Sequence, residues 1–129
     1  MFTVRNVLAA GVLLFGASYL WLTPVWLGLG DPKLGVFDPK GLLAMITVLG
    51  FAAAAWGIFR AASWWEPIAI GSALVGIVSG IPYWIFAHGV AAVDKVAMFQ
   101  NIGLHFVGGA AVAAFLLYPT TERWLTGRL

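Results

Sequence analysis

Apolar residues fill four long runs of this chain, and charged residues fall between or beyond the runs. The runs cover residues 7–30, 41–59, 67–87 and 96–118. Each is close to the roughly 20 residues that an α-helix needs to cross about 30 Å of hydrocarbon. Because a charge at the centre of a bilayer is costly, its exclusion from the runs indicates that lipid surrounds them. The pattern predicts an all-α protein, an integral membrane bundle of four transmembrane helices.

The whole chain, residues 1–129, is predicted to form a single transmembrane domain, because the runs leave no room for a soluble one. Hydrophobic residues make up 62% of the chain and charged residues 9%, whereas an average soluble domain carries about 25% charged residues. The first run is longer than the roughly 7–15 apolar residues of a cleavable signal peptide. We therefore expect it to be retained as the first span.

Basic residues favour one orientation of these spans. With four spans, both termini and the second loop share one side of the membrane. That side carries four arginines and the opposite side three lysines: Arg5, Arg60, Arg123 and Arg128 against Lys33, Lys40 and Lys95. Cytoplasmic loops carry the excess of Lys and Arg. We expect a multi-pass protein of the cell membrane with cytoplasmic N- and C-termini.

Prolines and aromatic residues mark the ends of the runs. Asp38-Pro39 and Glu66-Pro67 are typical helix starts, since proline is well tolerated in the first helical turn. Pro119 predicts the end of the fourth span. Trp and Tyr gather at the same boundaries, as they do in the aromatic belts of membrane proteins.

Small residues predict where the helices touch. In lipid, helices associate through close backbone contact and hydrogen bonds. Ser72, Gly76 and Gly80 recur every fourth residue along the third span, and Gly109 follows His105 by four residues on the fourth. We expect these four small residues to pack against a neighbouring helix, and Gly76 and Gly80 to face its backbone. Whether that helix belongs to the same chain or to a second copy stays open.

Polar side chains inside the runs predict a candidate ligand site. Asn101 and His105 lie one helical turn apart on one face of the fourth span, near mid-membrane. Gln100 is rotated by about 100° from that face. The outer end of the third span adds an aromatic pair and a second histidine. We predict a pocket in the outer half of the bundle lined by His105, Asn101, Gln100, His88, Tyr83 and Trp84.

Two interpretations of this cluster remain open. Intramembrane polar residues often mark functional sites, which favours a ligand or proton site at His105. Alternatively, Asn101 and His105 hold helices together through hydrogen bonds to hydroxyls such as Ser18, Thr47, Ser72 or Ser79. A neutral imidazole costs far less in lipid than a carboxylate, so His105 is compatible with a purely structural role.

Several chemistries are excluded or disfavoured by the composition. The chain has no cysteine, which excludes disulfides, thiolate nucleophiles and Cys-ligated metals. No catalytic set and no third metal ligand accompany the histidines. Haem is a weaker candidate than quinone or lipid, because His88 and His105 differ in depth by roughly two turns. The spans hold no carboxylate of the kind that proton-coupled exporters use, and a net charge of +2 is too small for a nucleic-acid surface.

The sequence therefore predicts a non-enzymatic accessory or structural subunit of a membrane complex or homo-oligomer. Its expected partners are the lipid bilayer and other membrane subunits or further copies of itself, with no nucleic acid. One alternative is a binder of a hydrophobic small molecule, a quinone or lipid and less readily haem, in the outer half of the bundle. Another is a small oligomeric transporter or channel.

Overall fold

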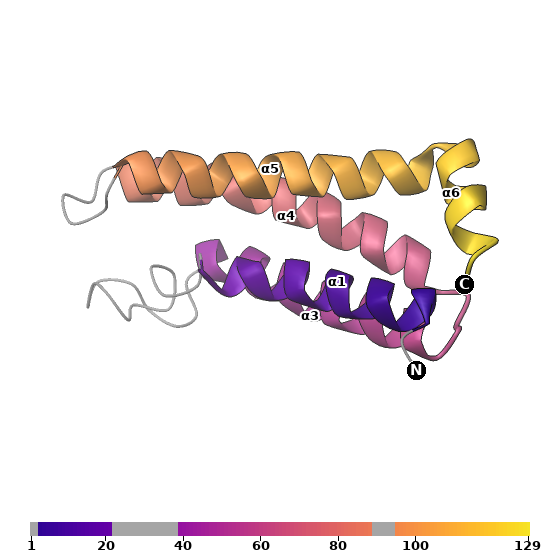
Figure 1. Cartoon of the computed structure of the whole chain (residues 1–129). Helices are drawn as coiled ribbons and strands as arrows, with labels where there is room; N and C mark the ends of the chain where they lie inside the picture. Colours follow the sequence, from indigo (N-terminus) through magenta and orange to yellow (C-terminus); the bar gives the residue numbers. More distant parts are fainter. Residues whose placement is uncertain (1–2, 22–38, 89–94) are drawn as a thin grey trace.

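The computed structural model describes residues 3–21, 39–88 and 95–129, and all of its regular structure is helical (Figure 1). The elements are α1 (Val4–Ser18), the 3-10 turn η1 (Tyr19–Trp21), α3 (Pro39–Phe59), α4 (Trp65–His88), α5 (Lys95–Leu117) and α6 (Pro119–Thr126). The all-α prediction is thus confirmed for the described residues. Three long helices, α3, α4 and α5, begin and end within two residues of predicted runs. The first run is described only as far as residue 21, so its second half lies outside the described residues.

Local side-chain and backbone chemistry explains the helix ends. Thr3 caps α1, where its hydroxyl oxygen accepts a hydrogen bond from the Asn6 backbone N–H at 3.2 Å, as expected of an N-cap threonine. The turn between α3 and α4 is closed by a hydrogen bond from the Ala62 N–H to the Gly57 carbonyl oxygen at 2.9 Å. Ala61 takes a left-handed φ of 53° in this turn.

Beyond α5 the chain forms a helix that the sequence pattern did not predict. Pro119 ends the fourth run, as expected, but it also opens α6, which is bent by 83° from α5. Tyr118 is extended, with φ −86° and ψ 115°, because a residue before proline avoids the helical region. The missing N–H of Pro119 is harmless at the first position of a helix. One proline therefore separates two helices.

The four long helices lie roughly antiparallel, and those that follow one another in sequence pack together (Figure 1). Contacts join α1 to α3, α3 to α4, and α4 to α5. The short α6 turns across one end of the bundle, where the N-terminal end of α1 also lies. The Arg5 guanidinium donates a hydrogen bond to the Leu129 carbonyl oxygen there, which links the two ends of the described chain.

Small and polar residues share the interior of this bundle with a few large side chains such as Phe51, Ile58 and Trp65, and large apolar residues cover its outside. Ala44, Ala54 and Ala73 are fully buried, as is Thr47. Serine and histidine side chains are buried as well: Ser72, Ser79 and His105. Leu14 and Leu104, by contrast, are 71% and 73% exposed, and large exposed hydrophobic residues recur on every long helix. The small inner residues allow the helix backbones to approach one another closely.

Length and composition identify fewer candidate membrane spans than the sequence predicted. Among the described residues, Leu42–Phe59 is long and apolar enough to cross a bilayer. A second span is counted if Ile102–Leu117 and Pro119–Thr126 are taken as one broken element. The apolar stretches Val4–Ser18 and Trp65–Ile81 are shorter than the required length. One or two candidate spans are weak support for a membrane location, and the four-span arrangement remains a prediction.

Candidate functional site

His105 lies in the interior of the bundle, where it joins α5 to the end of α1. Its side chain is buried, and its Nε2 atom lies 3.0 Å from the hydroxyl oxygen of Ser18. The Ser18 hydroxyl also lies 2.5 Å from the Phe15 carbonyl oxygen. Since a carbonyl only accepts, the single hydroxyl proton goes to Phe15, and Ser18 accepts a hydrogen bond from His105. In this arrangement the imidazole carries a proton on Nε2.

Tyr19 makes the second link between the same two elements. It is fully buried, and its ring packs edge-on against the His105 imidazole with 4.4 Å between ring centres. The Tyr19 hydroxyl donates a hydrogen bond to the His105 carbonyl oxygen at 3.3 Å. Phe15 and Phe51 pack around the Tyr19 ring. The sequence predictions named Ser18 as a partner for His105 but missed Tyr19. A tyrosine inside an apolar run needs a hydrogen-bond partner for its hydroxyl. This requirement could have identified Tyr19 as a residue that joins helices.

Glycines leave space for the side chains that pack around Tyr19 and His105. A Cβ atom added to Gly76 would lie 2.6 Å from the Tyr19 hydroxyl oxygen and 3.0 Å from the Thr47 methyl carbon. The Phe15 ring fills a similar notch at Gly108, where an added Cβ would lie 2.5 Å from the ring. At Gly109 the neighbours are Ile77 and the Ala73 carbonyl oxygen, at 3.0 and 3.2 Å. Close approach thus depends on the absence of a side chain at several places around the bundle.

Ser72 and Gly80, which were also predicted to pack against a neighbouring helix, differ in how closely they do so. Ser72 is buried against α3, and a Cβ added to Gly50 would lie 2.1 Å from the Ser72 hydroxyl oxygen. At Gly80 the nearest atom is the Ile102 methyl carbon at 3.8 Å, which is an ordinary van der Waals contact. The atoms nearest to both Gly76 and Gly80 therefore belong to side chains, and not to a helix backbone as predicted for the two glycines. A larger residue has more room at Gly80 than at Gly76.

The predicted pocket around His105 is not assembled by the described residues. Gln100 is exposed and lies with Gly103, Leu104 and Val107 along a shallow depression on the outer face of α5. His105 faces inward from the same helix, so the two side chains are not brought together. Trp84 is 42% exposed on α4. The side chains of Asn101, His88 and Tyr83 lie outside the described residues.

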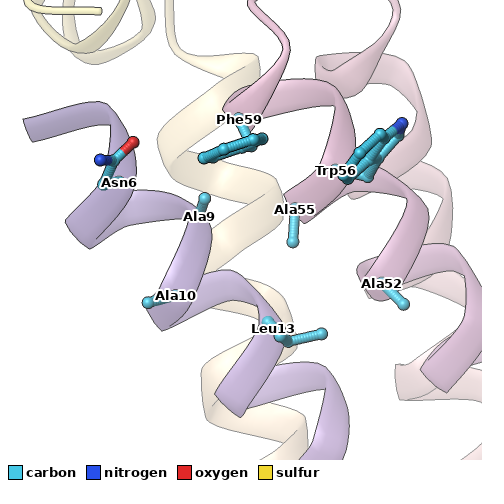
Figure 2. A pocket seen from close by; sticks show the side chains of 8 residues that line it. All are labelled: Asn6, Ala9, Ala10, Leu13, Ala52, Ala55, Trp56 and Phe59. Carbon is cyan, nitrogen blue, oxygen red and sulfur yellow. The ribbon is translucent and has the colours of Figure 1, made fainter.

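Hollows lined by described residues occur elsewhere on the bundle. The groove between α1 and α3, of about 550 Å³, is lined largely by alanines and closed at one end by aromatic side chains (Figure 2). Its lining residues are Asn6, Ala9, Ala10, Leu13, Ala52, Ala55, Trp56 and Phe59. In Figure 2 these side chains form two rows, one on each helix.

A second groove lies under α6, and we call it the α6 groove. It has a volume of about 420 Å³, and all of its lining side chains are apolar apart from the tryptophan N–H groups. It is lined by Leu8, Val12, Trp65, Ala69, Ala111, Val112, Phe115, Leu116, Trp124 and Leu125. Four helices contribute to it, namely α1, α4, α5 and α6. It lies at the end of the bundle opposite to the predicted pocket.

Charged side chains surround this end of the molecule. The Arg128 guanidinium carbon lies 4.4 Å from the centre of the Trp124 ring, and that of Arg60 lies 5.7 Å from the Trp56 ring. Such stacking of a cation on a ring is favourable. Burial, together with the nearby charge of Glu122, raises the pKa of Glu66 above its ordinary value. In the described part of the chain, neither glutamate forms an ion pair with an arginine.

Within the described residues, no group of three or more His, Asp or Glu side chains is positioned to hold a metal ion. Comparison of the chain with family models, with curated proteins and with solved structures gives no match.

Proposed function

We propose that this protein is a small integral membrane protein with four membrane-spanning helices and cytoplasmic termini. In this proposal it acts as a non-enzymatic accessory or structural subunit of a membrane complex or of a homo-oligomer. Its outer surface faces lipid and partner helices, and its interior serves to hold the bundle together.

The observation that carries this proposal is the exposure of large apolar residues on every long helix. Val107 and Ile85 are 66% and 65% exposed, and Leu49 on α3 is 63% exposed, while hydroxyl and imidazole groups are buried. In water, such apolar faces on every long helix would exceed the patches that soluble monomers expose. In lipid they cost nothing, and the buried small and polar residues supply the packing and hydrogen bonds that hold transmembrane helices together.

The hydrogen bonds made by the buried polar side chains favour a structural role over a catalytic one. Thr47 donates to the Leu43 carbonyl oxygen at 2.9 Å, Ser72 to that of Ile68 at 2.6 Å, and Ser79 to that of Gly76 at 2.7 Å. Each of these hydroxyls is therefore satisfied within its own helix. His105 is bonded through Nε2 to Ser18. This supports the interpretation in which the polar cluster joins helices.

Membrane fractionation and reporter fusions test the location. We expect the protein to stay in the membrane pellet after an alkaline carbonate wash. A reporter fused after residue 129 and one inserted within residues 31–40 should report opposite sides of the membrane. Release by carbonate, or equal reporter activity at the two positions, would refute the four-span proposal.

Gentle extraction into nanodiscs followed by native mass spectrometry tests the role as a subunit. We expect the chain to appear in a defined assembly, either with further copies of itself or with other membrane proteins at fixed stoichiometry. A monodisperse monomer without protein partners would contradict this part of the proposal.

Binding of a hydrophobic small molecule is a second candidate function, and the α6 groove is the observation that favours it. The predicted cluster around His105 offers a weaker basis, since Nε2 is already bonded within the bundle. His105→Phe keeps the bulk of the ring and removes its hydrogen bonds. A folded His105→Phe variant that loses a co-purified quinone or haem would favour a site at His105 instead.

A further inference from the structure

At one end of the α6 groove lies a positively charged side chain, and a residue that lines the groove contacts it. The Trp124 ring lines the groove and packs edge-on against Phe115, with 6.3 Å between ring centres. On the same tryptophan lies the Arg128 guanidinium, 4.4 Å from the ring centre. An apolar wall thus leads directly to a positive charge at the end of the bundle.

A second guanidinium lies at the same end of the groove. Arg5 precedes the lining residue Leu8 by three positions, so the two share a face of α1. The Arg5 guanidinium donates to the carbonyl oxygen of Leu129, the residue after Arg128. Arg5 therefore contacts the residue that follows Arg128, and the two arginines come from opposite ends of the described chain.

Positive charge predominates at this end. Four arginines and two glutamates lie at this end of the predicted bundle, and within the described residues no ion pair joins an arginine to a glutamate. The Arg5 guanidinium donates to the Leu129 oxygen and the Arg123 Nε to the Pro119 oxygen, and each guanidinium carries further N–H groups for other acceptors. A surplus of guanidinium groups above an apolar groove is complementary to an amphiphile with a negative head.

We propose that the α6 groove binds one acyl chain of an anionic glycerophospholipid, whose phosphate is held by Arg128 and Arg5. This inference rests on the proposed membrane location. The groove volume of about 420 Å³ lies in the range of about 300–1,000 Å³ that is usual for ligand sites. Guanidinium groups bind phosphate oxygens with two parallel hydrogen bonds, so the arginines select a lipid with a net negative charge.

Native mass spectrometry of the full chain tests the head-group selection. The protein is placed in nanodiscs containing equal amounts of phosphatidylglycerol and phosphatidylcholine, and the retained lipids are identified on release. We expect the wild type to retain one phosphatidylglycerol. Arg128→Gln should lower the preference for phosphatidylglycerol by about fivefold, the factor that one basic side chain near an anionic surface contributes.

Arg60→Gln is the matched control. Arg60 also lies over a tryptophan, Trp56, at the same end of the bundle, but that tryptophan belongs to the groove between α1 and α3. This variant should keep the wild-type preference. An equal loss in both variants would overturn the proposal, since it would show a general effect of surface charge.

A second pair of variants tests the acyl-chain site itself. Ala111 lines the α6 groove and is exposed, so Ala111→Phe fills the groove without disturbing the core. Ala114 is also exposed on α5 but does not line the groove. We expect Ala111→Phe to lose the retained lipid and Ala114→Phe to keep it. Retention by Ala111→Phe would overturn the site.

The experiments distinguish a failure of the lipid site from a failure of the proposed membrane role. A protein that resists carbonate but retains both lipids equally would refute the lipid site and leave the membrane role standing. A protein that is washed from the membrane would refute both.

Discussion

The contacts between helices that follow one another in sequence differ from the contact that closes the bundle between α1 and α5. The backbones of consecutive helices pack closely along their length, and at Gly16 of α1 the missing side chain leaves room for Phe51 of α3. Helices α1 and α5 pack less extensively, and they are bridged by the Ser18–His105 hydrogen bond and by the Phe15 ring at Gly108. Toward α6 this closing contact opens into the α6 groove.

The difference indicates how this chain combines a rigid bundle with a place for a ligand. Close backbone contact stabilises the bundle, and the groove that remains between α1 and α3 is lined largely by alanines. Contacts made by side chains hold helices farther apart and leave space beside the bridge. In the lipid proposal, an amphiphile binds in the space beside the closing contact.

The largest expected effect comes from Gly76→Ile, which breaks the closely packed centre. An added Cβ would already lie 2.6 Å from the Tyr19 hydroxyl oxygen, so isoleucine displaces the ring and its bond to the His105 carbonyl. We expect a loss of about 3 kcal/mol in the free energy of unfolding, the upper range for overpacking. Thermal melting in detergent measures it. Gly71→Ile on the same helix, with no atom within 4 Å of an added Cβ, should melt close to wild type, and equal melting of both variants would contradict the packing.

Gly16→Ala probes the consecutive contact between α1 and α3. The added methyl would lie 2.4 Å from the Phe51 Cβ, which is anchored to the backbone and cannot rotate away. We expect destabilisation by about 2 kcal/mol. The control is Gly11→Ala on the same helix, where the space is open and alanine gains up to about 1 kcal/mol of helix propensity over glycine. The two alanines should thus shift the melting temperature in opposite directions.

A double-mutant cycle on Ser18 and His105 measures the polar bridge of the closing contact. Ser18→Ala and His105→Phe each remove the hydrogen bond between the two side chains, so their effects should not add. We expect a coupling free energy of about 0.6 kcal/mol, the average for hydrogen bonds between transmembrane helices. Additive effects would mean that the bridge contributes nothing to stability and would revive a ligand role for His105.

The smallest expected effect concerns the end of the bundle near α6. Burial and Glu122 raise the pKa of Glu66 in the folded state, so the folded protein holds this proton more tightly than the unfolded chain. The stabilisation is complete below the ordinary pKa and is lost as pH rises through the raised value. Glu66→Gln should remove this slope while changing stability at neutral pH by no more than about 0.5 kcal/mol. Glu122→Gln should flatten the slope in part, and an unchanged slope in both variants would contradict the assignment to Glu66.

The sequence predicted the long helices well, because the apolar runs and the prolines at Pro39 and Pro67 carry local information. It failed at α6, whose eight residues hold few apolar positions and whose direction depends on the backbone restriction at Tyr118 and Pro119. Ser18 was predicted as a partner for His105. The choice of Ser18 over Thr47, Ser72 and Ser79 depended on how four helices come together, which no local pattern contains.

The two predicted glycine positions on α4 illustrate the same limit. Gly76 and Gly80 lie on one ridge of the helix, and the sequence treats them alike. Only Gly76 faces the Tyr19 ring, whereas Gly80 meets a side chain at an ordinary distance. The sequence pattern did not reveal the α6 groove either, since Trp65, Ala111 and Trp124 lie on three different helices and come together only in the folded bundle.

The Ser18–His105 hydrogen bond joins residues 87 positions apart in sequence, and this separation has a consequence for biogenesis. Helices that emerge one after another from the ribosome pair with the helix just before them, as α3 with α1 and α4 with α3. The bridge to α1 forms only once α5 has been synthesised. Until then the Ser18 and Tyr19 side chains lack their α5 partners, so the contact between the first and the last long helix is the last of these to form.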